Sequence, residues 1–191
     1  MPDDHDLAAL VASRICHDLI SPIGAIGNGL ELVAMTGAPN GPEMELIVQS
    51  VAQANARLRL FRLAFGAAGD GAVPVREVRE ILDGMTAGTR LVIDWQPPSA
   101  TRREVKIAFL LLQCLETAMP YGGRITVHGP DRIEAEAPRL RALPDLWPVL
   151  QGAVGEVGPA QAHFLLAARA ISTLGRQVEV TETPTALALR Y

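Results

Sequence analysis

The feature that most constrains the fold is a long stretch in which apolar or small residues recur every three or four positions. It runs from Leu7 to Val33, and this spacing places one apolar stripe along a helix. The residues of the stripe are Ala8, Ala12, Ile15, Leu19, Ile23, Ile26, Leu30 and Val33. We therefore predict one long amphipathic helix that buries this stripe.

A second stretch repeats the pattern after a cluster of turn-forming residues at 36–41. Pro42 suits the first position of a helix, and Glu43 and Glu45 would lie where the helix dipole favours acids. Apolar residues spaced by three and four follow at Met44, Ile47, Val51, Ala54, Leu58, Phe61 and Phe65. Two long helices joined by a short turn form an antiparallel hairpin.

The apolar surface of this hairpin is too wide for two helices to bury. Further apolar residues flank the second stripe at Leu46, Val48, Leu60 and Leu63. We expect a second copy of the chain to cover them, which gives a homodimeric four-helix bundle about a two-fold axis. The alternative is a hairpin that packs only on the C-terminal half of its own chain.

His17 lies on the side of the first helix opposite the apolar stripe. It is two residues from Ile15 and two from Leu19, and at about 100° per residue this turns it about 200° from both. We predict a solvent-exposed imidazole among mostly small neighbours. Ile20 on the same side is an apolar residue that a purely solvated face does not need. An ordinary surface histidine is the alternative.

The second half of the chain has a different pattern, after a Gly- and Ala-rich run from Gly66 to Ala72. Helices are expected at 75–85, 99–119 and 161–174, and strands at 90–95, 124–128, 132–136, 176–182 and 185–191. This order predicts an α+β domain with a mixed sheet and helices on one face. We assign residues 1–66 to the hairpin, 67–73 to a linker and 74–191 to the α+β domain.

Composition excludes several classes of function. Apolar residues make up 49% of the chain, and the net charge of −4 offers no basic surface for nucleic acid. The four histidines are scattered and no CxxC occurs, so we expect no metal site. No apolar run approaches the roughly 20 residues of a membrane span, and the N-terminus is too acidic for a signal peptide. We expect a soluble, cytoplasmic protein.

The residues around His17 resemble a known motif. His-Asp-Leu-Ile-Ser-Pro at 17–22 resembles the H-box of two-component histidine kinases, in which the histidine is followed by an acid, a leucine, two residues and a proline. The longer string at 15–32 resembles the alphaproteobacterial histidine phosphotransferases of the ChpT type more closely. The rest of the chain matches that family in layout. The resemblance implies a dimeric helical bundle followed by a degenerate kinase ATP-binding (Bergerat) domain.

The C-terminal half lacks the residues with which that kinase domain binds ATP. In the kinases one helix carries two asparagines four apart, the second of which reaches magnesium; Gln113 and Thr117 stand at these positions. The kinase Asp-x-Gly-x-Gly motif is missing. The separate glycine loop of the kinases is missing too, because Gly152, Gly155 and Gly158 are spaced by threes and lack its tight Gly-x-Gly turn. No P-loop replaces them. We expect the chain to bind no nucleotide, cofactor or metal.

The resemblance implies that His17 is a phosphoacceptor. An imidazole with a pKa of about 6.5 is largely neutral at cellular pH, so a ring nitrogen can attack an aspartyl phosphate. Magnesium would come with the receiver domain that carries this phosphate. Asp18 would orient or deprotonate the ring, although an adjacent carboxylate points about 100° away on a helix. Which ring nitrogen it meets is left open.

The same resemblance implies docking of receiver domains around His17. On the first helix the candidates for this contact are Ser13, Arg14, Ile20, Ser21 and Gly24. On the second helix Arg57 and Arg59 come level with His17 if the turn is centred near residue 39, so they are candidates to lie near a phosphoryl group. Ordinary solvated arginines are the alternative.

Taken together, these features predict a homodimeric histidine phosphotransferase in two-component signal transduction. Its partners would be the receiver domains of a hybrid histidine kinase and of response regulators. A second hypothesis is an ATP-dependent histidine kinase, which ATP alone would label. A third is a non-catalytic dimeric module that binds or sequesters receivers, whose binding would survive the loss of His17.

Overall fold

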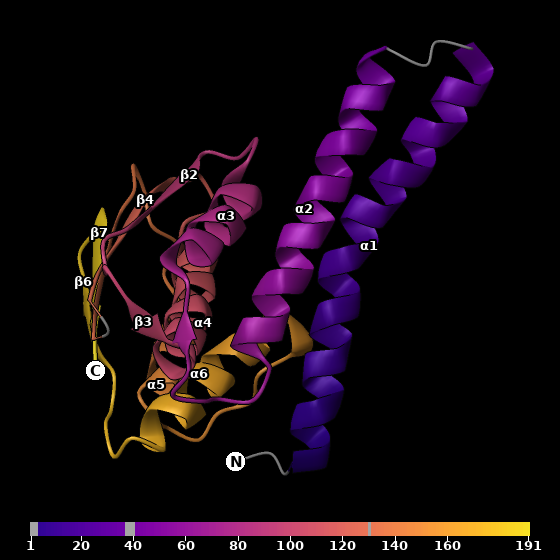
Figure 1. Ribbon diagram of the computed structural model, residues 1–191. Coiled ribbons are helices and arrows are strands. Elements are labelled where there is room, and N and C mark those ends of the chain that lie inside the picture. The colour runs from indigo at the N-terminus through magenta and orange to yellow at the C-terminus, as the bar shows by residue number, and fades with distance from the viewer. Residues whose placement is uncertain (1–3, 37–40, 130) are drawn as a thin grey trace.

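The N-terminal part of the molecule is a pair of long antiparallel helices. The computed structural model describes residues 4–36, 41–129 and 131–191. Helix α1 spans Asp4–Thr36 and helix α2 spans Pro42–Ala64 (Figure 1). The two predicted helices are confirmed, and most of the predicted turn between them lies outside the described residues.

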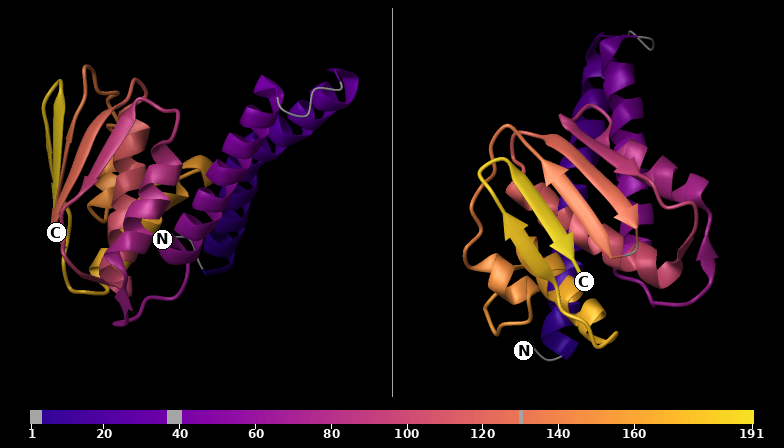
Figure 2. Two further views of the ribbon diagram at one scale, coloured as in Figure 1. Left: turned by 45° about the horizontal axis from the view of Figure 1, so that its top comes forward. Right: turned by 90° about the vertical axis from the view of Figure 1, so that its left-hand side faces the viewer.

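The remainder of the chain forms an α/β part whose helices lie between its sheet and the hairpin (Figures 1 and 2). Its elements are β1 (Ala72–Val73), α3 (Val75–Thr86), β2 (Leu91–Trp95), β3 (Ala100–Thr101), α4 (Arg102–Ala118), β4 (Gly123–Gly129), β5 (Arg132–Glu136), α5 (Leu146–Leu150), η1 (Pro159–Gln161), α6 (Ala162–Ser172), β6 (Glu179–Glu182) and β7 (Ala186–Arg190). The main sheet has the strand order β2-β4-β5-β7-β6. Strands β2 and β4 are parallel and the other neighbours are antiparallel, so the sheet is mixed as predicted.

The strands expected from the sequence are all present, and the predicted strand at 132–136 coincides with β5. The short antiparallel pair β1 and β3 and the 3-10 turn η1 were not predicted. Each of these elements has only two or three residues, which is too short to show a hydrophobic period.

Helix α4 is the centre of the core. Its N-terminus is closed by a capping box, in which Thr101 Oγ1 accepts from the Glu104 backbone N–H at 3.2 Å and the Glu104 carboxylate accepts from the Thr101 N–H at 2.7 Å. Phe109 and Leu110 within it are completely buried. Helices α2 and α6 and strand β4 all pack against α4, which explains why its sequence is apolar on almost every side.

The Gly- and Ala-rich segment after α2 is hydrogen-bonded to the first turns of α4. Lys106 Nζ donates to the Gly66 carbonyl at 2.6 Å, and Arg102 Nε donates to the Ala67 carbonyl at 3.1 Å. The Arg103 backbone N–H donates to the Gly69 carbonyl at 3.0 Å. A segment whose composition favours a flexible linker is therefore held along a defined path.

The far end of the hairpin projects beyond the α/β part (Figure 1) and exposes apolar side chains. The exposed large apolar residues of the hairpin are Ile20, Ile23, Leu30, Leu32, Met35, Leu46, Val48, Val51 and Leu58. The prediction of a fully buried stripe is wrong for a single chain: Ile15 and Leu19 pack against the core, whereas Ile23 and Leu30 are 58% and 54% exposed. The physical reason is that two helices bury only their shared seam, and the α/β part covers only one end of the hairpin.

Helix α1 is also long and apolar enough to cross a membrane. The window Asp6–Met35 has a mean hydropathy of 1.3 and is 6% buried. The prediction from the sequence, that no apolar run approaches the length of a membrane span, is wrong for length and composition, as helix α1 shows. A single helix that meets the criterion by length and composition alone is weak evidence for a membrane span.

Candidate functional site

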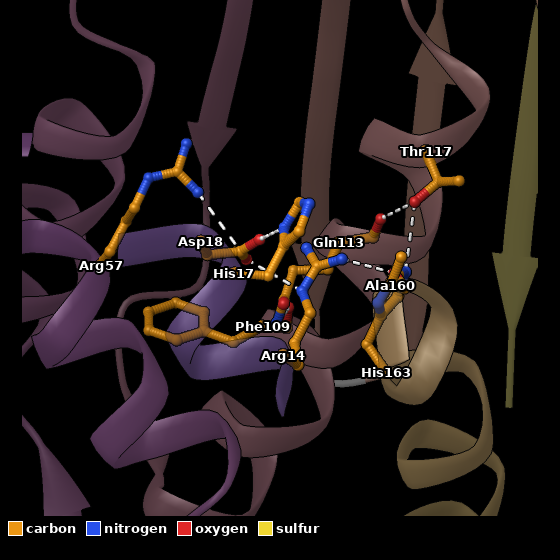
Figure 3. Close-up of polar contacts among 9 residues, drawn as sticks. All are labelled: Arg14, His17, Asp18, Arg57, Phe109, Gln113, Thr117, Ala160 and His163. Atoms are coloured by element: carbon orange, nitrogen blue, oxygen red, sulfur yellow. Dashed lines mark hydrogen bonds and ion pairs between the residues drawn. The ribbon is translucent and has the colours of Figure 1, made fainter. Parts of the chain in front are cut away.

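The imidazole of His17 stands on the exposed side of α1, as predicted. Its side chain is 72% exposed, and its Nδ1 lies 3.1 Å from Asp18 Oδ1 (Figure 3). The contact resolves which ring nitrogen Asp18 meets. A carboxylate oxygen can only accept, so Nδ1 carries the ring proton in the neutral imidazole and Nε2 keeps its lone pair. The contact with Asp18 therefore does not involve the Nε2 lone pair.

Asp18 is the buried member of this pair, with a side chain only 8% exposed. Its Oδ2, which does not contact the ring, lies 2.8 Å from Arg14 Nε and 3.8 Å from Arg57 Nη1. One oxygen therefore meets two guanidinium groups and the other meets the imidazole (Figure 3). A carboxylate in this position can stabilise a positive charge that develops on the ring.

Of the two arginines considered on α2, only Arg57 reaches the site. Arg59 instead faces α3, where its guanidinium lies 3.4 Å from Glu80 and 3.9 Å from Glu77. The suggestion that Arg59 lies near His17 is therefore wrong. Arg57 and Arg59 are two positions apart on α2, so their side chains point about 200° apart around the helix. Only one of them can therefore face α1.

A groove of about 360 Å³ lies beside the imidazole, between α1 and α2. Its lining residues are His17, Asp18, Ser21, Pro22, Ala25, Leu46, Gln49, Ser50, Gln53 and Arg57. The polar residues that α2 contributes, Gln49, Ser50 and Gln53, were missed in the sequence. They fall between the apolar positions of the α2 stripe, where polar residues are expected on any amphipathic helix, so no pattern marks them.

The residues predicted to dock a receiver divide into two groups. Ser13, Ile20, Ser21 and Gly24 are exposed on α1, and Ile20 is 69% exposed. Arg14 differs, because its side chain is 15% exposed and its guanidinium is engaged within the molecule. The structure thus leaves four of the five α1 residues accessible to a partner.

Gln113 and Thr117, which the sequence resemblance places opposite the kinase asparagines, make contacts inside the α/β part. Gln113 is 4% exposed and its Nε2 donates to the Phe109 carbonyl at 3.0 Å. Thr117 Oγ1 donates to the Gln113 carbonyl at 2.9 Å and lies 3.2 Å from Nε2 of His163 on α6 (Figure 3). His163 was not singled out in the sequence, since nothing marks it within an apolar helical stretch.

His163 is completely buried, and this burial, together with the nearby Arg14 guanidinium, lowers its pKa from 6.5 to about 3. The unfolded chain takes up a proton at this residue below about pH 6.5, whereas the folded chain does not until about pH 3. Folding stability is therefore lost as the pH falls below 6.5, by about 1.4 kcal/mol per pH unit at most.

We expect the free energy of unfolding to fall by about 2 kcal/mol more for the wild type than for His163→Leu when the pH is lowered from 7 to 5. Urea denaturation at the two pH values measures the difference. His128→Gln, which removes a half-exposed imidazole from the sheet, is the control and should keep the wild-type slope. Equal slopes for wild type and His163→Leu would contradict the assignment.

Within 4–36, 41–129 and 131–191, no group of three or more His, Cys, Asp or Glu side chains is placed to hold a metal ion. The positive charge next to His17 comes instead from Arg14 and Arg57.

Comparisons with known proteins point to the same chemistry. Residues 75–186 match the family model described as the histidine phosphotransferase C-terminal domain. Protein phosphotransferase ChpT of Brucella abortus (strain 2308) is 36% identical over 169 residues, which cover 83% of this chain and 80% of that protein. A solved bacterial phosphotransferase structure aligns with a TM-score of 0.82 and 29% identity, over 99% of this chain and 97% of that one.

A histidine kinase, AdeS of Acinetobacter baumannii, aligns more loosely, with a TM-score of 0.44 and 15% identity over 91% of this chain and 96% of that one. The family model and the curated relative both identify the chain as a histidine phosphotransferase. The chain belongs to the histidine phosphotransferase family and is a phosphotransferase of phosphorelay signalling.

Proposed function

We propose that His17 is the residue that carries the phosphoryl group, taking it from the aspartyl phosphate of one receiver domain and passing it to the aspartate of another. The observation that carries this proposal is an imidazole that is 72% exposed and whose Nδ1 contacts Asp18. Donor and acceptor would be the receivers of a hybrid histidine kinase and of response regulators.

In the proposed step, the Nε2 lone pair attacks phosphorus as the bond between phosphorus and the aspartyl oxygen breaks. The electron pair of that bond leaves with the receiver's carboxylate, and the ring becomes positively charged. The Nδ1 proton stays on the ring, where Asp18 stabilises the charge. The reverse step, with another aspartate as nucleophile, discharges the phosphohistidine.

The transferring group needs little from this chain beyond position and charge. Phosphoryl transfer is accelerated mainly by alignment and by neutralisation of the phosphoryl oxygens. Arg57 borders the groove beside His17 and is placed to offer a guanidinium to such an oxygen. Magnesium and its acidic ligands would come with the receiver, which fits a site built from an imidazole, one carboxylate and two arginines.

Receiver docking is proposed on the exposed side of α1. Ser13, Ser21 and Gly24 are small or short residues around His17, and a Cβ added at Gly24 would meet no atom within 4 Å. Ile20, 69% exposed, would supply an apolar contact at the centre of this surface. Arg57 is the proposed docking residue on α2.

The exposed far end of the hairpin supports a homodimer. Its apolar side chains would be buried if two hairpins formed a four-helix bundle, at about 25 cal/mol for each Å² removed from water. Within each chain, we propose that 1–66 is the dimerisation and phosphotransfer hairpin, 67–73 a linker and 74–191 a degenerate Bergerat domain. The cytoplasm is the proposed location, since two-component receivers act there.

One assay with two phosphoryl donors tests this function. Receivers encoded in the source genome are phosphorylated, separated from the small-molecule donor and mixed with the chain in the presence of Mg²⁺. We expect radiolabel to move from at least one receiver to the chain and to show the acid lability of a phosphohistidine. Labelled ATP alone should give no label, because Gln113 and Thr117 are engaged in the core.

Two outcomes would overturn the proposal. Label from ATP alone would identify a kinase, and the absence of label from every receiver would reject the relay role. Binding of a receiver that persists in His17→Ala, with no transfer to the wild type, would favour the non-catalytic receiver-binding module instead.

A further inference from the structure

A single side chain connects the α/β part to the histidine site. Arg14 of α1 donates from Nη1 to the carbonyl oxygen of Ala160 in η1 (Figure 3). The same guanidinium lies 2.8 Å, through Nε, from Asp18 Oδ2. Helix α1 packs against both η1 and α6, so this contact lies within a packed interface.

These contacts form a continuous path to the reacting ring. It runs from the Ala160 carbonyl to Arg14, from Arg14 to Asp18 Oδ2, and from Asp18 Oδ1 to Nδ1 of His17. We call this path the Arg14 bridge. The contact of Arg14 with Asp18 is an ion pair, and without it the described residues leave Asp18 Oδ2 with only the more distant guanidinium of Arg57, at 3.8 Å.

We propose that Arg14 is a positioning residue, through which the α/β part holds Asp18, and thereby the imidazole of His17, in the orientation needed for phosphoryl transfer. The proposal rests on the proposed role of His17 and adds a role for η1 and its flanking segment. It gives the α/β part a direct role in the chemistry of the hairpin.

The surroundings of Arg14 favour a fixed bridge over an incidental contact. Its side chain is 15% exposed, so the guanidinium is largely withdrawn from water and depends on its protein partners. The buried imidazole of His163, just beyond η1, lies near enough to sense its charge. Lys106 and Arg102 tie the α/β part to the chain leaving α2, so the hairpin is held at a second place.

Arginine suits this position for a geometric reason. Its planar group presents several N–H donors in a rigid fork, so it can reach a carbonyl and a carboxylate at once. Lysine keeps the charge but offers a single ammonium, which cannot reproduce both directions. A role that needs only positive charge next to Asp18 would be restored fully by lysine, whereas a bridge would be restored only in part.

The test compares Arg14→Gln and Arg14→Lys with the matched control Arg62→Gln, all in the full chain. Arg62 on α2 is paired with Glu77 at 2.9 Å, so this control removes an arginine–carboxylate pair elsewhere on the hairpin. Nitrogen-15 NMR of histidine-labelled protein measures the tautomer of His17, and the four histidines of the chain keep that spectrum simple. Amide hydrogen exchange at Gln161 reports on η1, because its N–H donates to Gly158.

We expect the proton of His17 to reside on Nδ1 in the wild type and in Arg62→Gln, and to be spread over both nitrogens in Arg14→Gln. Exchange at Gln161 should be faster in Arg14→Gln. The maximal rate of transfer from a phosphorylated receiver should fall about 10- to 100-fold with little change in the receiver concentration that gives half the maximal rate. For Arg14→Lys, the transfer rate should lie between the rates of the wild type and of Arg14→Gln.

An Arg14→Gln variant with the wild-type tautomer and transfer rate would overturn the proposal, as would full recovery in Arg14→Lys. Circular dichroism establishes that each variant is folded, and if Arg14→Gln is not, Arg14→Lys carries the same comparison. Phosphorylation by phosphoramidate, which needs no receiver, separates the two proposals. If no receiver transfers a phosphoryl group to the wild type, the proposed function fails. The tautomer of His17 in Arg14→Gln still shows whether Arg14 positions the ring.

Discussion

A His17→Gln variant is expected to accept no phosphoryl group from any receiver that labels the wild type. Glutamine is polar and similar in size, so it can occupy a side chain that is 72% exposed without disturbing α1. Its amide nitrogen has no available lone pair, so nothing replaces Nε2 as the nucleophile. Transfer should fall below detection, a loss of at least about 1000-fold, measured as radiolabel on the chain after gel separation.

The control for this experiment is His128→Gln, which removes an imidazole from the sheet, where His128 contacts Gln96 and Glu134. It should be labelled at the wild-type rate. Label at the wild-type level on His17→Gln would reject His17 as the phosphoacceptor. Thermal melting of both variants should match that of the wild type, because neither side chain belongs to the core.

A Leu30→Glu variant is expected to be a monomer at concentrations where the wild type is a dimer. Leu30 is 54% exposed in the single chain and lies among the apolar residues of the far half of the hairpin. In the proposed bundle the carboxylate would be buried without a partner in both copies, which costs several kcal/mol for each ion. We expect the dimer dissociation constant to rise at least about 100-fold, as measured by sedimentation velocity.

Val92→Glu is the matched control, because Val92 is 48% exposed but lies on strand β2 of the sheet, away from the hairpin. It should leave the dimer unchanged. Circular dichroism should show that Leu30→Glu keeps its helices. A wild-type chain that is monomeric at all concentrations, or a Leu30→Glu chain that remains fully dimeric, would contradict the proposed bundle.

The order of elements was predictable because hydrophobic spacing is a local property. Helix α2 begins at Pro42 and strand β5 spans 132–136, as their patterns predicted. The exposure of His17 followed from its angular distance to Ile15 and Leu19 on one helix. Elements of two or three residues, such as β1 and η1, have no period to detect and were missed.

The contacts within the site were less predictable, since they depend on how separate helices are rotated against each other. The level of Arg57 and Arg59 along the hairpin could be derived from the position of the turn. Which of them faces α1 depends on the rotation of α2, and the structure selects Arg57. Arg14 was expected to face a partner, and packing against η1 instead turns it toward Ala160.

By itself the sequence determined that an imidazole stands on the solvent-exposed side of a long helix, and that the kinase nucleotide-binding motifs do not occur. Both follow from residue identity and from spacing along one chain segment. Only the tertiary structure decided that Asp18 meets Nδ1, that Arg14 joins Asp18 to the α/β part, and that His163 is buried and neutral. Those results depend on side chains brought together from α1, α2 and α6, and no local pattern encodes the distance between them.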